Sequence, residues 1–538
     1  MKQSSIIAMT MAALISSAVY AQAIHDADPL NREAAMLFVS AGELYPITSW
    51  PVEGSQLITA LEGLAERNQE TGQEARDLIR RLKATEGSLF WQAELATAFC
   101  ARTFERLLPS ERSRYYDTLL SYLGKPQLMT LSGGVNAPEG ISADMAFSLR
   151  KEWDGVFSSA GNIPEFGQEG NPLPFDNHAM ERADLRFILG KTIFSFGRNA
   201  VKTGQSGFFS LYPDDSLPYL DRIGISSRGD RIAFDWYAST IQPIPAFDGY
   251  DLALPAQLEG GDDQRPTVLV VKRLALQNRI FRFGLGQVVL YSRANAYYTL
   301  ADFLPLIDWH AADVRPNNMA LLLDAGWVPI PGLETFASIG FDEISGEAFG
   351  IVDSDIPTTW ALLLGAKGNL LKGSAVFSPK LQLGYTHYLW GNYDAALSAH
   401  SSEDSTLARA VYRYASDGGA ILMPLTSPFG PGAAWMQLEL EFVSEDLPVS
   451  LAGDLLILGK FPEADLVSTR YARNVLLDRI PPFAVASLGV AATHTSRWTE
   501  LYARPALYLT PADINVSFDL VVRLMLTGKE SLSGEKSR

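Results

Sequence analysis

Apolar and polar residues alternate along the last part of the chain, from Asn515 to Thr527. One set of positions is apolar throughout, and the set between them is mixed and carries all the polar and charged residues: Val516, Phe518, Leu520, Val522, Leu524 and Leu526 against Ser517, Asp519, Val521, Arg523 and Met525. A period of two is typical of a β-strand with one apolar face. This stretch is therefore predicted to be a strand that is apolar on one side only.

The same alternation recurs from about residue 124 onward, most clearly at residues 231–238, 281–292 and 436–442. Charges on the second face cannot point into lipid, because an Arg or Lys at the bilayer centre costs roughly 2–4 kcal/mol. They would line a lumen instead. The pattern predicts an all-β transmembrane barrel of on the order of 16 to 18 antiparallel strands, at ~22 residues per strand with its share of loop.

A soluble β-sandwich or propeller would also alternate. No internal repeat of blade length is visible in the sequence, which disfavours a propeller. The chain of 538 residues is long for a single sandwich. The barrel is therefore the favoured fold.

The segment from residue 24 to 123 follows a different pattern. Apolar residues recur at helical spacing, with Glu, Arg and Gln between them: Leu57, Leu61, Leu64, Ala65, Leu78, Ile79 and Leu82. A second helical piece is expected at residues 92–108, although residues 93–100 could also form a strand. We therefore predict a small α-helical periplasmic region at 24–123, followed by the barrel at 124–538.

The first 23 residues have the layout of a secretory signal. Lys2 precedes an apolar run from Ile6 to Val19, and Ala21-Gln22-Ala23 is a small-x-small cleavage sequence. No later apolar run reaches the ~20 residues that a spanning helix needs. An exported chain with strands for spans is expected in the cell outer membrane, surrounded by outer-membrane lipid.

Net charge and motif content exclude several functions. The formal charge of −17 and the absence of Lys/Arg clusters argue against a nucleic-acid partner. The single cysteine, Cys100, excludes a disulfide within the chain. No nucleophile elbow, zinc-binding pair or phosphate-binding loop is present, and a catalytic pairing of His387 with Ser427 lacks its surrounding motif. We therefore expect no enzymatic activity, no cofactor and no metal.

Several short patterns occur in order along the mature chain. They are Gly42, Pro46 and Trp50-Pro51 ahead of a predicted helix; Phe194-Ser-Phe-Gly197-Arg198 followed by Gly204 and Gly207; Asn278-Arg279-Ile280 followed by Gly284-Leu285-Gly286; Asn317-Asn318 to Asp324; and Phe429-Gly430-Pro431-Gly432. In this order they resemble the Wzi family of outer-membrane proteins, which is associated with assembly of the surface capsule. The chain departs from the family in its loop at 199–207, which lacks a tryptophan, and at Gln287, where an acid is common.

The resemblance implies a barrel that binds or organises surface polysaccharide at the cell surface. Aromatic faces stack on sugar rings, and Asp, Asn and Arg hydrogen-bond their hydroxyl groups. The candidate binding residues, each with packing as the alternative role, are Trp309, His310, Trp390 with Tyr393, and, for an anionic group, Arg198 and Lys202. A porin for small solutes and a structural barrel with a periplasmic protein partner are the rival functions.

Overall fold

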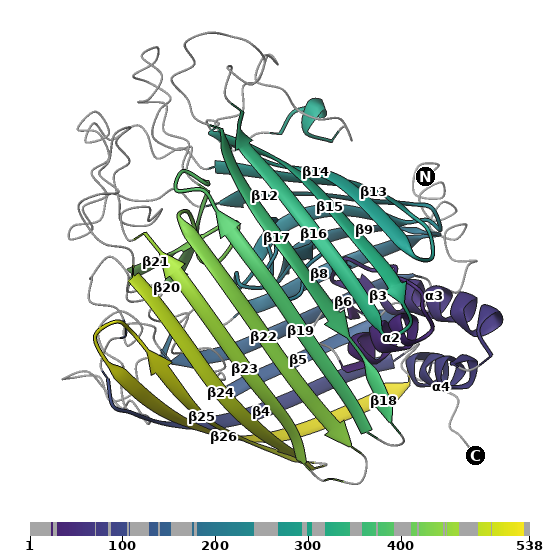
Figure 1. The fold of residues 1–538 in the computed structure, drawn as a ribbon. Coiled ribbons are helices and arrows are strands. Elements are labelled where there is room, and N and C mark those ends of the chain that lie inside the picture. The colour runs from purple at the N-terminus through teal and green to yellow at the C-terminus, as the bar shows by residue number, and fades with distance from the viewer. Residues whose placement is uncertain are drawn as a thin grey trace.

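The computed structural model describes residues 23–24, 29–69, 71–83, 88–104, 107, 129–137, 140–151, 175–176, 180–241, 267–292, 298–303, 318–344, 358–372, 375–391, 410–416, 419–444, 447, 449–461, 483–496 and 498–531. Within these residues, antiparallel strands close into a barrel of 18 main strands (Figure 1). This confirms the predicted fold class and strand number. Among the helices described, none is long and apolar enough to cross a membrane.

Each strand of the barrel pairs with the next one in the chain, and the last, β26, pairs with the first, β4. Two short strands, β7 and β18, lie beside the direct pairs β6–β8 and β17–β19. In chain order the strands are β4 (Ser88–Arg102), β5 (Met129–Ala137), β6 (Ile141–Lys151), β7 (Phe175–Asp176), β8 (Met180–Leu189), β9 (Thr192–Asn199), β11 (Leu220–Arg228), β12 (Ile232–Ile241), β13 (Thr267–Gln277), β14 (Phe281–Ser292), β15 (Asn318–Ile330), β16 (Leu333–Glu343), β17 (Thr359–Gly368), β18 (Leu370–Lys372), β19 (Ala375–Thr386), β22 (Ala433–Ser444), β23 (Val449–Lys460), β24 (Phe483–Thr495), β25 (Thr499–Leu509) and β26 (Ile514–Ser531).

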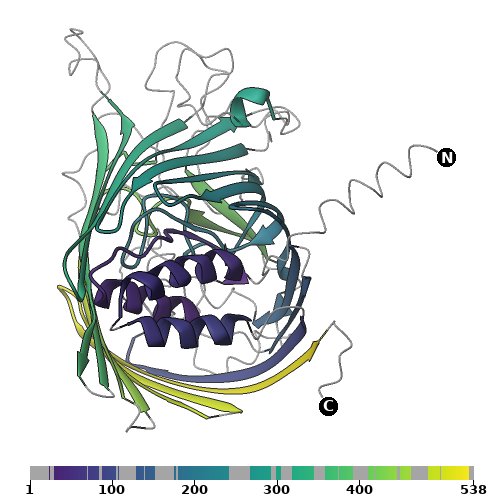
Figure 2. The same cartoon turned by 90° about the vertical axis from the view of Figure 1, so that its right-hand side faces the viewer.

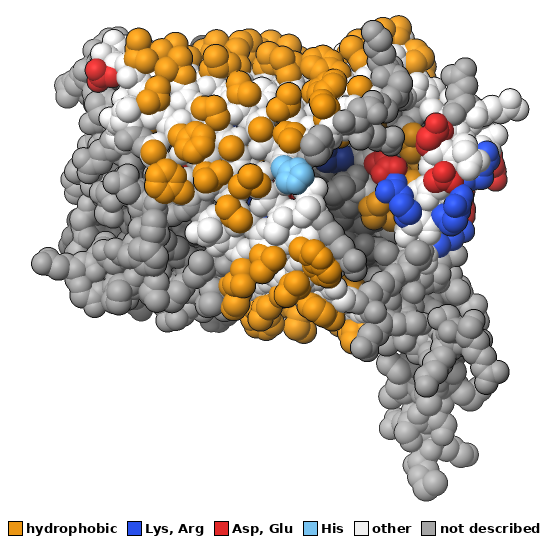
Figure 3. Space-filling view, turned by 90° about the horizontal axis from the view of Figure 1, so that it is seen from below, with side chains coloured by type: hydrophobic (Ala, Val, Ile, Leu, Met, Phe, Trp, Pro, Cys, Tyr) orange, Lys and Arg blue, Asp and Glu red, His pale blue; other side chains and the backbone are white. Residues whose placement is uncertain are grey.

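The outer wall of the barrel is apolar, as the alternation predicted. On β26, Val516, Phe518 and Val522 are each at least 40% exposed, whereas Ser517 and Val521 face inward and are buried. Hydrophobic side chains are spread over the wall of the barrel in Figure 3. A soluble protein rarely leaves so wide an apolar surface uncovered, so the wall fits a lipid environment.

The two ends of the barrel differ in the length of their connections. At one end the hairpins turn within a few residues, at 190–191, 229–231, 278–280 and 331–332. At the other end long stretches of chain join the strands, such as 242–266 and 387–432, the second of which contains the hairpin β20 (Val411–Ser416) and β21 (Gly419–Pro424). Bacterial outer-membrane barrels have short periplasmic turns and long extracellular loops.

Three helices, α2 (Pro29–Ser40), α3 (Gly54–Arg67) and α4 (Gly72–Lys83), lie across the end with the short turns (Figure 2). The helical stripe that the sequence predicted is their shared core, in which Leu57, Leu61, Leu64 and Leu78 are fully buried. Helix propensity alone would not keep helices of this length stable. Burial of their shared apolar stripe holds the three helices against one another.

The helix predicted at residues 92–108 is wrong over most of its length, because residues 88–102 form strand β4 of the barrel. The alternative that 93–100 forms a strand is the one the structure adopts. Leu95 and Phe99 point outward and are about half exposed, at 52% and 49%. The described barrel therefore begins at Ser88, ahead of the boundary at residue 124 that the sequence suggested.

Candidate functional site

The chain between the helices α2 and α3 enters the lumen and is fastened to its wall. Its short strand β2 (Ser49–Trp50) pairs with β10 (Lys202–Thr203), which belongs to the loop between β9 and β11. Thr48 Oγ1 accepts a hydrogen bond of 2.9 Å from Arg273 Nη1, and Ser49 Oγ donates one of 2.8 Å to Asp235 Oδ2. Residues 44–53 are therefore held against β12 and β13, well inside the barrel.

Buried ion pairs reinforce this attachment. Arg273 forms a bidentate pair with Asp324, at 2.9 and 2.6 Å, and neither side chain is exposed. Arg186 on β8 lies 2.5 Å from the carboxylate of Glu53, which is in β3 (Val52–Glu53) of the N-terminal segment. Burial raises the pKa of Glu53, and the charge of Arg186 opposes that rise. Charges in such a site are tolerated only when paired and hydrogen-bonded. The Arg186–Glu53 pair therefore ties the segment directly to the wall, and the Arg273–Asp324 pair holds the guanidinium group that donates to Thr48.

The loop between β9 and β11 also lies inside the barrel. The side-chain amide of Gln382 on β19 accepts hydrogen bonds from Gly207 N and Phe208 N, both at 2.9 Å, and donates one of 3.2 Å to Phe209 O. Gln205 in the same loop is hydrogen-bonded to Glu334. The loop between β9 and β11 therefore crosses the lumen from β9 to β16 and β19 instead of forming a turn at the rim.

A third segment packs into the same space from the far side. Trp390 donates from Nε1 to Thr426 Oγ1 at 3.2 Å, and its ring is 1% exposed. The ring of Phe429 lies 5.5 Å from that of Phe209 and 5.1 Å from that of Trp435. Together with the loop after β9, these residues form an apolar core inside the barrel.

The lumen-facing side of β23, β25 and β26 is less tightly covered. Arg504 pairs with Asp454 at 3.0 and 2.7 Å, and Arg523 pairs with Glu500 at 2.5 Å. The exposed fractions of these four side chains are 12%, 32%, 31% and 20%, in that order. This part of the wall is polar and reached by solvent, which is a surface that hydroxylated or charged solutes can contact.

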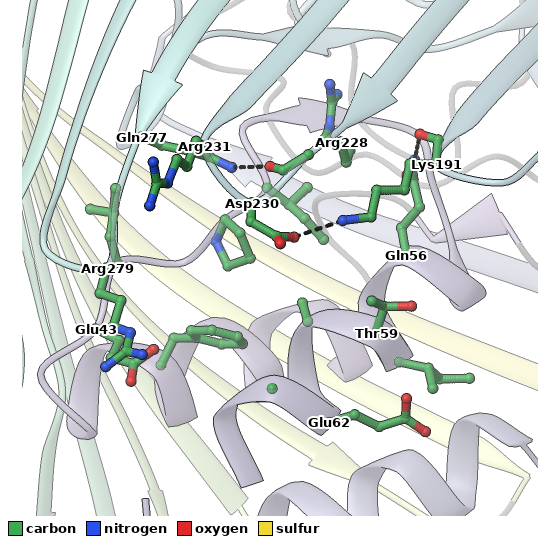
Figure 4. Close-up of a pocket in the computed structure, with 18 of the residues that line it drawn as sticks. Glu43, Gln56, Thr59, Glu62, Lys191, Arg228, Asp230, Arg231, Gln277 and Arg279 are labelled. Carbon is green, nitrogen blue, oxygen red and sulfur yellow. Dashed lines mark hydrogen bonds and ion pairs between the residues drawn. The ribbon is translucent and has the colours of Figure 1, made fainter. Parts of the chain in front are cut away.

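A pocket of about 750 Å³ lies beneath the lumen, between α3 and three short turns of the barrel (Figure 4). Arg67 from α3 forms a bidentate pair with Glu43 at 3.1 and 2.6 Å. Across the pocket, Lys191 lies 2.8 Å from Asp230, and this ammonium group lowers the pKa of the Asp230 carboxyl. The volume is within the range typical of ligand pockets.

The three predicted binding residues that the structure describes, Trp390, Arg198 and Lys202, do not lie together. Trp390 is enclosed in the core of the lumen. Arg198 lies on the outward face of β9, with Phe194 and Phe196, and pairs with Asp221 at 2.6 and 2.8 Å. Lys202 is buried in the lumen and donates to Phe208 O at 3.3 Å. The remaining candidates lie outside the described residues: Trp309, His310 and Tyr393.

The side chain of Arg198 is thus 25% exposed and Lys202 is 5% exposed, and both interact with other residues of the chain itself. Binding at the six predicted residues stays a prediction. The sequence reading passed over the basic residues of the short turns, Arg231 and Arg279, which line the pocket. Their position directly beside Gly229-Asp230 and Asn278 was the available signal, since such sequences mark hairpin turns.

The pairing of His387 with Ser427 is also not formed. His387 Nδ1 accepts from Leu389 N at 3.3 Å, and burial lowers the pKa of this imidazole. The Ser427 hydroxyl is buried with no hydrogen-bond partner in the part of the chain that the structure covers. In that same part, no group of three or more His, Cys, Asp or Glu residues could hold a metal ion.

Comparison with known proteins finds similarity at the level of the fold. No family model and no curated protein sequence matches the chain. Among solved structures, it resembles Wzi of Escherichia coli, an outer-membrane protein involved in group 1 capsule assembly and described as a carbohydrate-binding β-barrel. The TM-score is 0.56 at 12% identity, covering 94% of this chain and 99% of that one.

Two barrels of Pseudomonas aeruginosa match less well. OccK5 and OprD both give a TM-score of 0.39, at 8% and 10% identity, over 82% of this chain. These scores are too low to support an argument. At its low identity, the similarity to Wzi establishes a shared barrel fold and nothing about ligands.

Proposed function

We propose that this protein is a non-enzymatic β-barrel of the outer membrane that binds or organises surface polysaccharide while its own chain closes the lumen. The observation that carries the proposal is the filling of the lumen by residues 44–53, by the loop at 200–219 and by the segments around Trp390 and Phe429. In such a barrel, many buried contacts hold the chain's own segments in the space that a passage would need. Binding at a surface needs no such passage.

The apolar outer wall and the unequal ends of the barrel support a location in the outer membrane. Polysaccharide is proposed as the ligand class by analogy with Wzi, which shares the barrel fold and is described as binding carbohydrate. The helices would then face the periplasm, since they lie at the end with short turns. A periplasmic protein partner for them stays a prediction.

One observation favours a porin as the alternative function. The ion-paired residues on the inner side of β23, β25 and β26 are partly exposed, and charged groups that line a passage can guide small polar solutes. In that case the segments in the lumen would narrow the passage without blocking it.

Two measurements on one refolded sample separate these functions. Binding is measured on an array that contains the surface polysaccharides of the producing cell, and conductance is recorded in planar bilayers with a general porin as positive control. Saturable binding with no conductance supports the proposal. Steady conductance without binding would instead support the porin function. If deletion of the gene changes neither the surface coat nor the uptake of solutes, both functions are contradicted.

A further inference from the structure

The pocket between α3 and the short turns contains charged residues of both signs, and most of them form ion pairs. Its acidic residues are each paired with a basic one: Glu43 with Arg67, Asp230 with Lys191, and Glu62 with Lys83, which lies outside the pocket. Arg228, a further lining residue, is paired with the buried Asp235.

Two arginines of the pocket remain without an acidic partner. Arg231, in the turn between β11 and β12, and Arg279, in the turn between β13 and β14, line the pocket and are exposed. Neither side chain has a hydrogen bond or an ion pair within the described residues. The chain as a whole carries a charge of −17, so two unpaired guanidinium groups at one opening form a local excess of positive charge.

The opposite side of the pocket offers an acceptor. Gln56 on α3 donates from Nε2 to Lys191 O at 3.5 Å, and its Oε1 is buried without a hydrogen-bond partner in the structure described. In Figure 4, Gln56 and Lys191 lie on one side of the opening, and Arg231 and Arg279 lie on the other. A ligand that satisfies both sides must carry hydroxyl donors and an anionic acceptor, and must be long enough to span the opening.

The inner surface of the pocket contains apolar residues between these polar groups. Phe38, Leu44, Ile47 and Ile58 are nearly fully buried where they line it. These side chains close the inner end of the pocket and leave the ligand contacts to the polar groups around its opening. An inorganic anion would not span the opening and would leave the Gln56 acceptor unused.

We propose that this pocket binds an acidic saccharide, with a carboxylate of the sugar held by Arg231 and Arg279 and its hydroxyl groups hydrogen-bonded to Gln56 and to the polar residues beside it. The choice of the acidic sugars of a surface polysaccharide as ligand rests on the proposed function. The carboxylate pairs with a guanidinium group in the geometry that Arg favours. Because the pocket opens at the short-turn end, the saccharide reaches it from the periplasmic side.

The test uses the intact protein in detergent micelles and calorimetric titration with tetragalacturonate. Maltotetraose is the neutral sugar control and tetraglutamate is the acidic peptide control. The double variant Arg231→Gln/Arg279→Gln removes the two unpaired charges. Its matched control is Arg76→Gln/Arg80→Gln, which removes two exposed charges from α4 outside the pocket. Thr59→Trp fills the pocket, since Thr59 lines it and is exposed.

The expected result is that the pocket double variant weakens tetragalacturonate binding by about tenfold or more, because each lost guanidinium removes a charge-assisted hydrogen bond. The α4 control should stay within about twofold of wild type at moderate salt, where surface charges are screened. Thr59→Trp should abolish binding. Equal binding by the pocket variants and wild type, or tighter binding of tetraglutamate than of tetragalacturonate, would overturn the proposal.

The same samples distinguish this proposal from the proposed function. If wild type and the pocket variants bind the cell's own polysaccharide equally well, the pocket is not the site while the function stands. If wild type binds tetragalacturonate through Arg231 and Arg279 but no surface polysaccharide, the pocket proposal stands and the function fails.

Discussion

At the scale of single residues, glycines on middle strands allow arginines to reach across the wall. Arg273 on β13 pairs with Asp324 on β15, and the strand between them carries Gly284 at the crossing point. Arg504 on β25 reaches Asp454 on β23 over Gly489 of β24 in the same way. The missing side chain leaves the space that the ion pair occupies.

Gly284→Ala is therefore expected to destabilise the barrel. A Cβ there would lie 2.4 to 2.9 Å from the carboxylate atoms of Asp324, so the buried pair must break or shift. Breaking a buried pair costs about 3–5 kcal/mol. The temperature at which the folded band is lost in semi-native electrophoresis should fall. Gly453→Ala, where a Cβ meets no atom within 4 Å, should leave it unchanged, and equal behaviour of the two variants would contradict the argument.

Asp214 makes the loop at 200–219 sensitive to pH. Burial, with a further contribution from Asp215, raises the pKa of its carboxyl from 3.8 to about 6. Between pH 3.8 and pH 6, Asp214 is therefore protonated to a greater extent in the folded loop than in the unfolded chain. Stability is greatest below 3.8 and falls as the pH rises through 6, by at most about 3 kcal/mol at 1.36 kcal/mol per pKa unit.

Hydrogen exchange of peptides from this loop, corrected for the intrinsic rate, should show less protection at pH 7 than at pH 4. Asp214→Asn should remove this pH dependence, since the amide does not titrate. The matched variant Asp230→Asn changes an exposed carboxyl outside the loop and should retain the dependence. A loop with the same protection at both pH values would contradict the argument, because it would mean that Asp214 does not change its protonation state between them.

At the scale of elements, one side chain joins the wall, the N-terminal segment and the loop. Arg282 on β14 donates to Tyr45 O at 2.6 Å, to Gln205 Oε1 at 2.9 Å and to Gln277 Oε1 at 3.0 Å. The side chain is 1% exposed. Arg282 therefore fastens both the N-terminal segment and the loop after β9 to the wall of the barrel.

Arg282→Met should loosen the segments in the lumen while the barrel remains closed. It leaves Tyr45 O and Gln205 Oε1 without their donor, at about 1–3 kcal/mol for each buried group. Faster hydrogen exchange is expected at residues 44–53 and 200–219, with little change in the strands. Arg279→Met, an exposed change on the same hairpin, is the control. If hydrogen exchange becomes faster by the same factor in the strands and in the lumen segments, the barrel and these segments unfold as one unit.

The elements that the sequence predicted best are those whose pattern depends on near neighbours. The alternation of residues 515–527 identified β26 because only one face of it meets lipid. The helix predicted at 92–108 failed for a related reason. Leu95 and Phe99 are four residues apart, and positions four apart share a face both in a helix and in a strand. Such spacing cannot distinguish the two structures.

The packing of chain segments inside the lumen could not be predicted from local patterns. Tyr45 and Arg282 are 237 residues apart, and Ser49 and Asp235 are 186 apart. Each polar residue alone is as compatible with an open lumen as with a closed one. The six candidate binding residues were chosen by side-chain type, and type alone did not indicate that Trp390 is buried or that Arg198 faces outward.

At the scale of the whole molecule, the apolar outer wall and the charged inner wall fix the environment that the barrel needs. Leu488, near the middle of β24, and Leu501, near the start of β25, both face outward and are 52% and 44% exposed. Leu501 pairs with His494, six residues along β24 from Leu488. In a bilayer the two positions differ in depth, whereas on a surface covered by water or by another protein depth has no meaning.

Leu488→Arg should therefore destabilise the folded barrel in lipid vesicles by roughly 2–4 kcal/mol, and Leu501→Arg by about 0–1 kcal/mol. The measurement is reversible urea unfolding in vesicles, followed by tryptophan fluorescence. The pair is its own control, because both variants make the same substitution on the same face. If both changes cost the same, the apolar wall does not lie in a bilayer, and the chain's place in a membrane would have to be rejected along with the functions that depend on it.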